Sequence, residues 1–446
     1  MIHAKETGAL VLGAALAAGA AGCTQGDAEA DRNEEGATVV SLWHSSGGAA
    51  GRALDSMVAS FNEQHRGEIE VRPVYQGDYN DSMAKFVASV QTGDLPALMQ
   101  ANNVETAFMK DSGVITPVEE LNERYGGFDF DGLVSSVRNY YEMDDTMYAM
   151  PAMISQPVMY VNDDLLAEAG LDASDFETTE ELVESSRKIN DELGVAGFTF
   201  PLDGWFMEQS ASMRGVELCS PGNGVGSERA QRFATGSDPV VDLWDDYEGL
   251  YASGAAHNPG IDNEAAAGAF LTGQAAIHIG TSGGFGNLMA NEPSFNWSVH
   301  RLPRDNDAAG AIPGGNSLWA VALGHDEEVQ RAAWEFMSYV GSDEVQAELF
   351  RDTGYLPTAE GALEELDDVD DNQKAMLGQL HSNPVNDVTA GCHSGALNSA
   401  LRDFERAMSS IANGEDAAET LEATTKEADD KIDTYNERAE LTHVEE

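Results

Sequence analysis

The chain has 446 residues, and its 78 acidic against 24 basic side chains give a formal net charge of −54. A surface this negative repels phosphate backbones and anionic lipid headgroups, which argues against nucleic acid as a partner. Because 42% of the residues are hydrophobic, the chain is globular rather than a disordered acidic polymer, and its length predicts two or three domains or lobes.

The excess of carboxylates also indicates the solvent. Repulsion among so many like charges is tolerable where the Debye length is about 3 Å, near 1 M salt. Lysine is scarce, with seven residues in the whole chain. We therefore expect a halophilic protein adapted to molar salt, and an acidic protein from ordinary surroundings is the alternative.

The N-terminus carries a weakly apolar stretch over residues 8–22, rich in Gly and Ala, that ends directly at Cys23. It is too short to span a bilayer, which needs roughly 20 apolar residues, and suits the apolar region of a secretory signal. The tripeptide that ends at Cys23 resembles a lipobox. We expect a signal peptide over residues 1–22, lipid attachment at Cys23 and a flexible linker over residues 23–37.

These features predict an exported protein anchored by lipid to the extracellular face of the cell membrane. The segment before the apolar stretch departs from a usual signal, because its one cation, Lys5, is balanced by Glu6 and no twin arginine is present. The export route therefore stays open. A disordered N-terminus with a chance cysteine is the alternative.

The first elements of the domain alternate between strand and helix. Apolar residues at helical spacing and glycines just after each helix mark the boundaries. We expect strands over 38–44, 68–75 and 96–100, with helices over about 50–65 and 80–92 between them. This order predicts βαβ units and a parallel sheet with helices on its faces.

The middle of the chain continues this pattern, and the end is helical. We expect strands over 157–162, 273–280, 296–303 and 317–323, and helices over 163–170, 181–193, about 329–340 and about 415–435. The glycine clusters over 221–226 and 282–287 are expected to be loops. The whole reads as an α/β fold in at least two lobes with a helical C-terminal part.

Two further cysteines, Cys219 and Cys392, lie far apart in the sequence. Export would permit a disulfide between them, but the sequence does not place them close together. No CxxC pair or Cys/His cluster has the spacing of zinc ligands. We expect two isolated buried thiols and no metal site.

Motifs for catalysis are missing from the sequence. It contains no phosphate-binding GxxxxGK[ST] loop and no HExxH, and its many paired carboxylates occur by chance in so acidic a chain. Aromatic residues beside glycines or strand ends are more informative, since they suit stacking on a polyol or sugar. These residues are Trp43, Tyr79, Trp205 and Tyr355. His44, at the end of the first strand, and His393, in a glycine-bounded loop, are further candidates.

Several stretches in consistent order resemble a known family. LWHSSGGAAGRALDSMVASFNEQH, VYQGDYNDSMAKFVASVQTGDLPALMQ, SQPVMYVND, GGNSLWAV and DTGYLP are similar to segments of the solute-binding proteins of carbohydrate-type (family 1) ABC importers, and within these to the subgroup that binds glycerol phosphate. The resemblance covers residues 38–435. It implies a two-lobed periplasmic-binding-protein-like fold of type II, with a hinge and a central ligand cleft.

The resemblance also implies the extent of each lobe. Lobe 1 would take residues 38–150 and 314–358, and lobe 2 would take residues 153–312 and 359–440. The ligand positions of the family fall on Tyr79, Asn103, Ser155, Trp205, Ser282, Gly314, Gly315 and Tyr355. With the candidates from the residues themselves, the expected ligand-binding set is Trp43, His44, Tyr79, Asn103, Ser155, Trp205, Ser282, Gly315, Tyr355 and His393.

Two departures from the family pattern leave the ligand open. Asn103 stands where the family has a glutamate, and His393 stands where it places an arginine near the phosphate. Arg402 is close in sequence, one helical segment further on. The loss of an arginine–phosphate contact would remove about 1.5–3 kcal/mol of binding free energy.

The leading hypothesis is a monomeric, non-enzymatic binding component of an ABC importer. It would hold glycerol 3-phosphate or a glycerophosphodiester in the cleft and deliver it to the permease subunits, without a cofactor. A binding protein for a neutral sugar or oligosaccharide is the alternative. An extracellular glycoside hydrolase that acts through two carboxylates is a remote one, because no motif nominates a pair.

Overall fold

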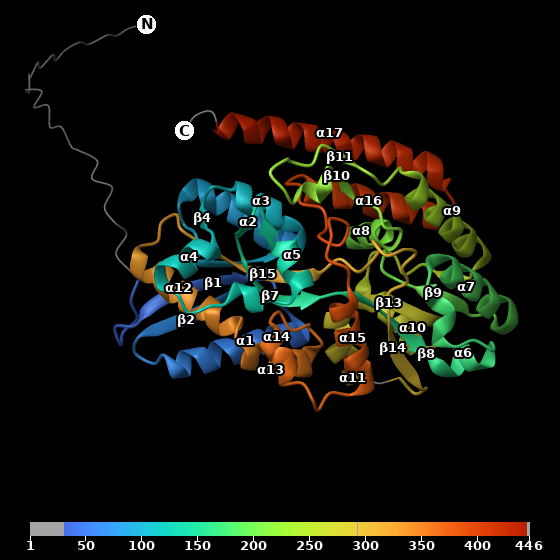
Figure 1. Cartoon of the computed structure of the whole chain (residues 1–446), viewed down its shortest axis with the longest axis horizontal. Helices are drawn as coiled ribbons and strands as arrows, with labels where there is room; N and C mark the ends of the chain where they lie inside the picture. The colour runs from blue at the N-terminus through green and yellow to red at the C-terminus, as the bar shows by residue number, and fades with distance from the viewer. Residues whose placement is uncertain (1–30, 292, 444–446) are drawn as a thin grey trace, which may run out of the picture.

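The computed structural model describes residues 31–291 and 293–443 (Figure 1). The expected signal peptide and the expected lipid attachment at Cys23 lie outside the described residues. The described part begins in contact with the domain, since Arg32 donates two hydrogen bonds of 2.7 Å to Glu328. None of the described helices is long and apolar enough to cross a membrane.

The first sheet forms lobe 1 and contains the predicted parallel strands. Its order is β2-β1-β3-β15-β4, and β7 also pairs with β15. β1 runs parallel to β2 and β3, as the βαβ pattern predicts, whereas β15 is antiparallel to its neighbours. The strands are β1 (Thr38–His44), β2 (Ile69–Tyr75), β3 (Leu98–Asn102), β4 (Ile115–Thr116), β7 (Met150–Ser155) and β15 (Gly314–Val321).

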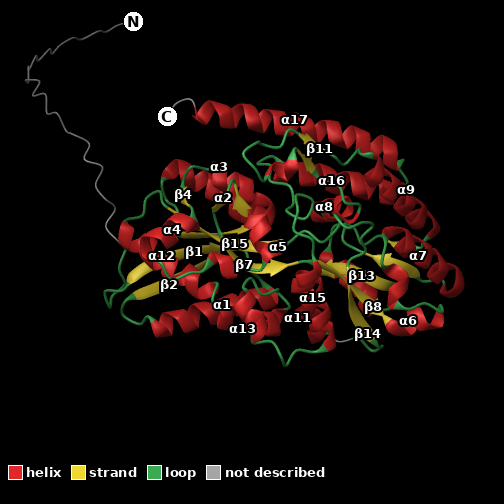
Figure 2. Ribbon diagram, viewed as in Figure 1, coloured by secondary structure: helices red, strands yellow, loops and turns green. Residues whose placement is uncertain are grey.

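Helices cover both faces of this sheet (Figure 2). α1 (Gly48–Gln64) buries Leu54, Met57, Val58 and Phe61 on one stripe, as its spacing predicts. α2 (Tyr79–Thr92) begins where Asp78 accepts the backbone N–H of Asp81, and it ends at a left-handed Gly93. The other helices of lobe 1 are α3 (Thr106–Asp111), α4 (Val118–Tyr125), α5 (Ser135–Tyr141), α12 (Glu327–Val340), α13 (Asp343–Thr353) and α14 (Glu360–Glu364).

The second sheet forms lobe 2 and has the order β12-β9-β13-β8-β14. β9 is parallel to β12 and β13, and β8 is antiparallel to β13 and β14, so both sheets are mixed. The two-lobed α/β fold expected from the sequence is confirmed. The strands are β8 (Pro157–Asn162), β9 (Ala196–Thr199), β12 (Ala256–His257), β13 (Ala275–Thr281) and β14 (Trp297–Arg301).

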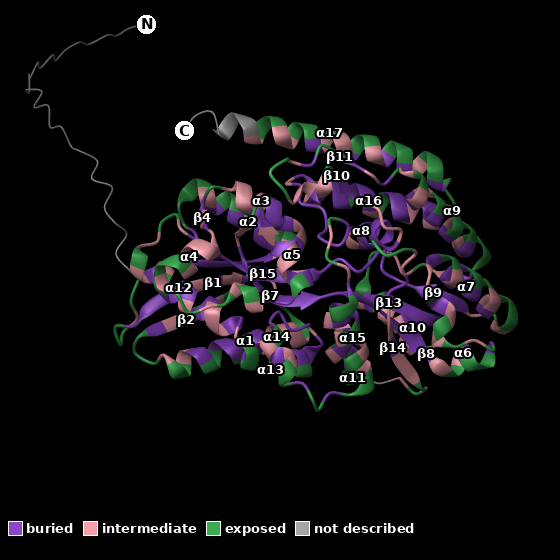
Figure 3. Cartoon of the chain, viewed as in Figure 1, coloured by how far each residue is buried: buried purple, intermediate pink, exposed green. Residues whose placement is uncertain are grey.

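The helical C-terminal part belongs with lobe 2. α16 (Leu397–Ala412) and α17 (Ala417–His443) pack on each other, on α8 (Gly204–Met213) and on α9 (Asp238–Ser253). Figure 1 shows α17 along the top of the molecule, and Figure 3 shows its outer face exposed while the central strands β7, β8 and β13 are buried. The remaining helices are α6 (Asp163–Glu168), α7 (Thr179–Leu193), α10 (Asn263–Leu271), α11 (Phe285–Ala290) and α15 (Asp371–Ser382).

The chain passes between the two sheets at short connections. β7 of the first sheet ends at Ser155 and β8 of the second begins at Pro157, with Gln156 alone between them. The return passage leads from β14 to β15 through residues 302–313. These crossings lie side by side, because Gly314 pairs with Ser155. They have the arrangement of a two-segment hinge.

Two expectations are wrong in detail. The glycine cluster over 282–287 is not wholly a loop: a 3-10 turn over Ser282–Gly284 leads into α11, because Phe285 and Leu288 find buried positions. The cluster over 221–226 contains a short 3-10 turn, Gly222–Gly224, beside the two-residue strands β10 (Cys219–Ser220) and β11 (Arg232–Phe233).

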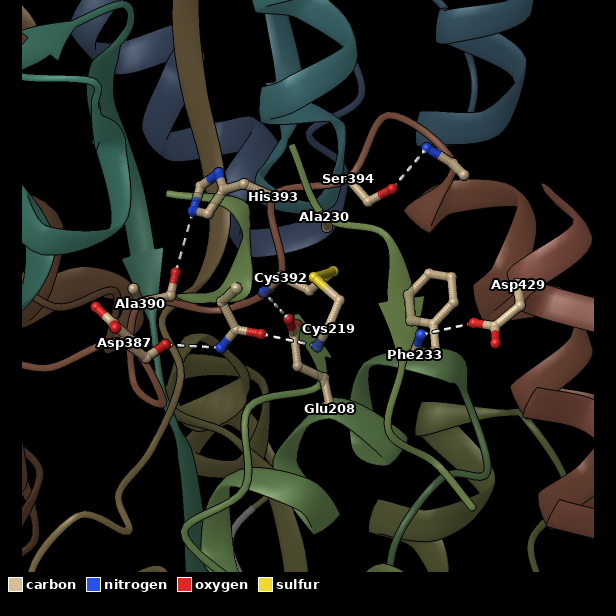
Figure 4. Close-up of a disulfide and its surroundings, with 12 residues drawn as sticks. Glu208, Cys219, Ala230, Phe233, Asp387, Ala390, Cys392, His393, Ser394 and Asp429 are labelled. Atoms are coloured by element: carbon tan, nitrogen blue, oxygen red, sulfur yellow. Dashed lines mark hydrogen bonds between the residues drawn. A yellow bond between two sulfur atoms is a disulfide. The ribbon is translucent and has the colours of Figure 1, made fainter. Parts of the chain in front are cut away.

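The expectation of two isolated thiols is also wrong, because Cys219 and Cys392 form a disulfide with their Cα atoms 5.5 Å apart (Figure 4). Both cysteines are buried in the core of lobe 2, which brings together segments 173 residues apart. Asn223 reinforces the junction: its side chain accepts the N–H of Cys219 and donates to the carbonyl of Asp387. The two cysteines are far apart in the sequence, and only the packing of the lobe 2 core brings them together.

Candidate functional site

A cavity of about 680 Å³ lies between the two lobes, and we call it the interlobe cleft. Lobe 1 contributes the start of α2 and the end of β3, lobe 2 contributes the start of α8 and one face of α16, and the crossing strands contribute its floor. The residues that line it are Asp78, Tyr79, Asn80, Asn102, Asn103, Val104, Glu105, Ser155, Asp203, Gly204, Trp205, Ile261, Asn263, Thr281, Gly314, Gly315, Tyr355, Asn398, Leu401, Arg402 and Glu405.

Tyr79 is the first residue of α2, so the N-cap at Asp78 fixes where its ring enters the cleft. Its hydroxyl oxygen accepts a hydrogen bond of 3.0 Å from the side-chain N–H of Asn316. The hydroxyl proton therefore remains available to a ligand. Burial raises the pKa of Tyr79, which keeps that proton in place at neutral pH.

Asn103 presents an acceptor to the cleft. Its Nδ2 donates to the hydroxyl of Tyr140 at 3.0 Å and to the carbonyl oxygen of Pro313 at 3.1 Å. Because the Pro313 carbonyl can only accept, the orientation of the amide is fixed and Oδ1 faces the remaining side. Asn103 can thus accept from a ligand hydroxyl or ammonium, whereas both of its donor hydrogens are already used.

Two aromatic rings lie against glycines at the walls of the cleft. A Cβ on Gly314 would stand 2.7 Å from the Trp205 ring, and one on Gly283 would stand 2.7 Å from the Tyr355 ring. Glycine is required at both positions because any side chain would displace the ring. Trp205 follows the N-cap Asp203 of α8, and among residues 31–291 and 293–443 its Nε1–H has no acceptor. A ligand oxygen that reached this group would satisfy it.

The charges around the cleft are unequal. Four acidic residues line it, Asp78, Glu105, Asp203 and Glu405, whereas Arg402 is the one Lys or Arg side chain among the described lining residues. Arg402 comes from lobe 2 and donates at 3.4 Å to the side-chain oxygen of Asn80 in lobe 1. One cation therefore stands alone in an acidic surrounding.

Burial changes the protonation of two of these acids. Glu105 is 2% exposed, and burial raises its pKa to about 8, although the backbone N–H of Asn102 opposes the shift. Burial likewise raises the pKa of Asp203 to about 7. Glu105 is protonated at neutral pH, and its Oε1 accepts 3.0 Å across the cleft from Asn398. This bond joins lobe 1 to lobe 2.

Replacement of Glu105 by glutamine should flatten the dependence of stability on pH. The unfolded state releases the carboxyl proton near pH 4.5, whereas the folded state holds it until about pH 8, so the free energy of unfolding of the parent protein falls as the pH rises through this window. Between pH 5 and pH 8 the parent should lose roughly 3 kcal/mol of unfolding free energy that the variant keeps. Denaturant unfolding from pH 5 to 9 measures this. Glu422→Gln, on the exposed face of α17, is the control and should follow the parent curve; equal slopes for all three proteins would contradict the assignment.

The structure brings most of the expected binding residues together. Six of the ten residues in the expected ligand-binding set line the cleft, and Gly314 lines it as well: the six are Tyr79, Asn103, Ser155, Trp205, Gly315 and Tyr355. Ser282 lies directly behind it, where its Oγ accepts the N–H of Gln156 at 3.2 Å and the side chain is fully buried. The turn that carries it still reaches the cleft through Thr281.

Three other candidates lie elsewhere. Trp43 packs against the core of lobe 1. His44 is buried at the end of β1 with its ring centroid 5.7 Å from that of Tyr75. His393 borders a different, smaller cavity. The end of β1 is covered by the turn that leads into α1, where the backbone N–H of Ser45 donates to the Gln100 side chain, so neither β1 residue reaches the cleft.

The sequence analysis did not predict that residues of α16, or the acids Glu105 and Asp203, line the cleft. Asn398, Leu401, Arg402 and Glu405 come from α16, and Glu105 and Asp203 come from helix starts. One signal could have found the first group: residues 398, 402 and 405 recur at helical spacing beside an apolar stripe of Leu397, Leu401 and Phe404. A polar row that borders an apolar stripe indicates a helix edge beside a cavity.

Comparison with known proteins agrees with this geometry. The family model for bacterial extracellular solute-binding proteins matches residues 56–376. The sn-glycerol-3-phosphate-binding periplasmic protein UgpB of Pectobacterium atrosepticum is 30% identical over 341 residues, which cover 74% of this chain and 75% of that protein. UgpB of Shigella flexneri is 30% identical over 339 residues, 74% of this chain and 76% of that protein.

Solved structures show the same fold at lower identity. UgpB from Mycobacterium tuberculosis in complex with glycerophosphocholine has a TM-score of 0.75 at 21% identity and covers 90% of this chain and 99% of its own. The GacH receptor of Streptomyces glaucescens, solved unliganded and with acarbose, has a TM-score of 0.72 at 18% identity, with 89% and 99% covered. The sugar-binding protein MalE of Xanthomonas citri has a TM-score of 0.73 at 18% identity, with 90% and 99% covered. The chain therefore belongs to the bacterial extracellular solute-binding proteins, the non-enzymatic components that supply a solute to ABC transporters.

Proposed function

We propose that this protein binds a glycerophosphodiester with a cationic head group in the interlobe cleft and delivers it to an ABC permease. The observation that carries the proposal is the charge pattern of the cleft: one cation, Arg402, shares it with the carboxylates of Asp78 and Glu405, with two carboxyl groups whose pKa burial raises, and with three aromatic rings. A phosphodiester has one negative charge, and a head group such as choline has one positive charge. The negative phosphate of such a ligand would face Arg402, and its positive head group would face the acidic and aromatic residues.

Arg402 suits the phosphate part. A guanidinium holds a phosphate by two parallel hydrogen bonds, which are among the strongest polar contacts in proteins. A phosphomonoester carries about −1.5 to −2 charge at neutral pH and would face the acidic walls with one counter-charge. A diester has less negative charge to place in the same surrounding, so a diester is favoured over glycerol 3-phosphate.

The remaining walls suit the other parts of the ligand. Tyr79, Trp205 and Tyr355 supply aromatic faces, which attract ammonium groups. Asp78 and Glu405 supply negative charge beside them, and Asn103 offers an acceptor for a glycerol hydroxyl. The names of the relatives support this class, since UgpB of Pectobacterium atrosepticum is a glycerol-3-phosphate-binding protein and that of Mycobacterium tuberculosis was solved with glycerophosphocholine.

A neutral oligosaccharide is the second candidate. The three aromatic rings and the side-chain amides of Asn80, Asn103 and Asn263 would suit a sugar, and proteins of the same fold bind acarbose and maltose. A neutral sugar leaves Arg402 without a specific role. This difference separates the two candidates experimentally.

Binding would proceed by closure of the lobes. Glu105 bonds to Asn398 and Arg402 bonds to Asn80, so residues of both lobes meet across the cleft, and a ligand that contacts both lobes would favour the closed state. We further propose that the lobes have the boundaries given from the sequence, except that α14 belongs to lobe 1, where Ala362 is part of the core. We also propose that lipid on Cys23 anchors the protein outside the cell membrane and that it works as a monomer in molar salt.

The test is a binding panel by calorimetry and thermal shift in molar salt. Glycerophosphocholine should bind at least about tenfold more tightly than glycerol 3-phosphate, because the monoester brings additional negative charge into an acidic cleft. At about 100 times Kd, a true ligand should add roughly 2.7 kcal/mol to the free energy of unfolding. Maltose and acarbose should have no effect. Stabilisation by either sugar without stabilisation by any phosphorylated glycerol would overturn the proposal.

A further inference from the structure

A second, smaller cavity lies between the lobes, separate from the cleft, and we call it the rear cavity. Its volume is about 120 Å³, which is enough for several waters or for one tetrahedral oxyanion. Lobe 1 contributes α3 and the turn between the short strands β5 (Glu142–Met143) and β6 (Thr146–Met147), and lobe 2 contributes the loop over 224–230, the segment over 393–395 and α17.

The two cavities share their walls. The turn over Asn103–Glu105 lines the cleft, and α3, which follows it directly, lines the rear cavity. In the same way, the segment over 393–395 lines the rear cavity and α16, which follows it, lines the cleft. Any occupant of the rear cavity would therefore contact both lobes behind the ligand site.

Two of the few cations of this chain line the rear cavity, and one of them, Lys110, is outside any ion pair of the described residues. Arg229 makes two hydrogen bonds to the Asp111 carboxylate, which also accepts from the Tyr435 hydroxyl at 2.9 Å. Lys110 lies 5.1 Å above the centre of the Tyr148 ring. Within residues 31–291 and 293–443, its ammonium group makes no hydrogen bond or ion pair. Asp111 and Asp144 attract this charge from a distance, but neither forms an ion pair with it, so the ammonium group can still donate to a bound anion.

His393 supplies a complementary feature on the opposite wall. The His393 side chain is 5% exposed, and burial lowers its pKa to about 4, so the ring is neutral at pH 7. Its Nε2 lies 3.1 Å from the carbonyl oxygen of Ala390 and must carry the proton, because a carbonyl can only accept (Figure 4). Nδ1 is then an acceptor. Among the described residues it is buried without any donor.

A hydroxyl proton is also available nearby. The Oγ of Ser394, 5% exposed, accepts the backbone N–H of Ala396 at 3.2 Å, which leaves its own hydrogen free to donate. Ser227 also lines the cavity and has a second hydroxyl. The walls thus offer several donors, the buried acceptor Nδ1 of His393 and the carboxylate of Asp144, so the occupant must both accept and donate.

We propose that the rear cavity binds a small protonated oxyanion, such as hydrogen phosphate, that accepts from Lys110 and the serine hydroxyls and donates its own hydroxyl to Nδ1 of His393. Hydrogen phosphate and bicarbonate have this chemistry. Sulfate does not at neutral pH, because it has no proton to donate. Chloride is excluded for the same reason.

The experiment compares phosphate, bicarbonate and sulfate by isothermal titration at pH 7, with phosphate binding also followed by ³¹P line broadening. It uses the full chain carrying Arg402→Met, so that the cleft offers no arginine to the anion. Phosphate or bicarbonate should bind at least about tenfold more tightly than sulfate, the value of one hydrogen bond to a charged group. Whichever of the two binds more tightly identifies the occupant.

Two lysine variants test whether the anion binds in the rear cavity. Lys110→Met in the same background should abolish the binding, whereas Lys188→Met should leave it unchanged, since Lys188 caps Gly170 at the surface of lobe 2. Binding that survives Lys110→Met would overturn the proposal. Equal affinity for sulfate and phosphate would also overturn it, as would no binding of any of the three anions, which would leave the cavity with water alone.

Discussion

Replacement of Arg402 by methionine should weaken the binding of glycerophosphocholine by about 100-fold, because a bidentate guanidinium–phosphate contact contributes about 1.5–3 kcal/mol. The effect should lie at the upper end of this range. Arg402 is the one cation among the described residues of a cleft that also holds four carboxyl groups, so without it the phosphate would meet only acids, amides and hydroxyls. Calorimetry on the parent protein and the variant in the same molar salt measures the ratio of affinities.

The neighbouring Arg406 provides a matched control. It lies one turn further along α16, 64% exposed, where it pairs with Asp403 and Glu427 away from the cleft. Arg406→Met should therefore leave the affinity unchanged. Arg402→Lys should recover only part of it, since lysine keeps the charge but loses the planar fork. An Arg402→Met protein that binds as tightly as the parent would place the phosphate elsewhere or exclude a phosphorylated ligand.

Much of the fold could be predicted because its first half follows local rules. Helical spacing and glycine stops located α1 and α2, a mostly apolar run located β1, and alternation located β2, each to within two residues. The position of β15, antiparallel between β3 and β4, was not predictable, because the chain reaches it only after it has passed through the other lobe. Two-residue strands such as β4 and β10 carry no periodicity, so they exist through their pairing alone.

The residues of the candidate site differ in the same way: those with local motifs could be predicted, and those that depend on tertiary structure could not. Residues at strand and helix ends with recognisable local motifs, such as Tyr79 and Tyr355, fall in the cleft. Arg402 was placed one segment away from the ligand, yet α16 folds back so that this residue reaches Asn80 of lobe 1. Burial decided the protonation of Glu105, and no local pattern reports how deeply a carboxyl will lie. Tertiary proximity, rather than residue type, was the missing information.

The net charge of −54 acquires a more specific meaning in the structure. Because cations are so few, each one in a cavity marks a place where a negative group is expected. Arg402 occupies the cleft and Lys110 occupies the rear cavity, whereas Arg32, Arg138 and Arg187 all pair with carboxylates at the surface. In an acidic protein, a cation that lies outside any ion pair therefore says more about where an anionic ligand binds than the net charge does.

Removal of the Cys219–Cys392 disulfide should lower the free energy of unfolding by about 2–5 kcal/mol, because the bond closes a long loop and restricts the unfolded chain. The double variant Cys219→Ala, Cys392→Ala avoids placing a hydroxyl in the core, where both cysteines are almost fully buried. Its denaturant midpoint, compared with that of the oxidised parent, measures the loss. The parent protein reduced under denaturing conditions and refolded with its thiols blocked is a second comparison.

The position of the disulfide makes its effect on binding distinct from its effect on stability. Cys392 donates its backbone N–H to Glu208 at 2.8 Å, and the next residue, His393, borders the rear cavity rather than the cleft. Affinity for the cleft ligand should therefore change little below the unfolding transition, whereas phosphate binding in the rear cavity should weaken as the segment over 391–395 loosens. A variant as stable as the parent would show that the lobe 2 core alone holds this segment. A variant that lost cleft affinity in proportion to stability would instead show that the disulfide maintains the lobe as a whole.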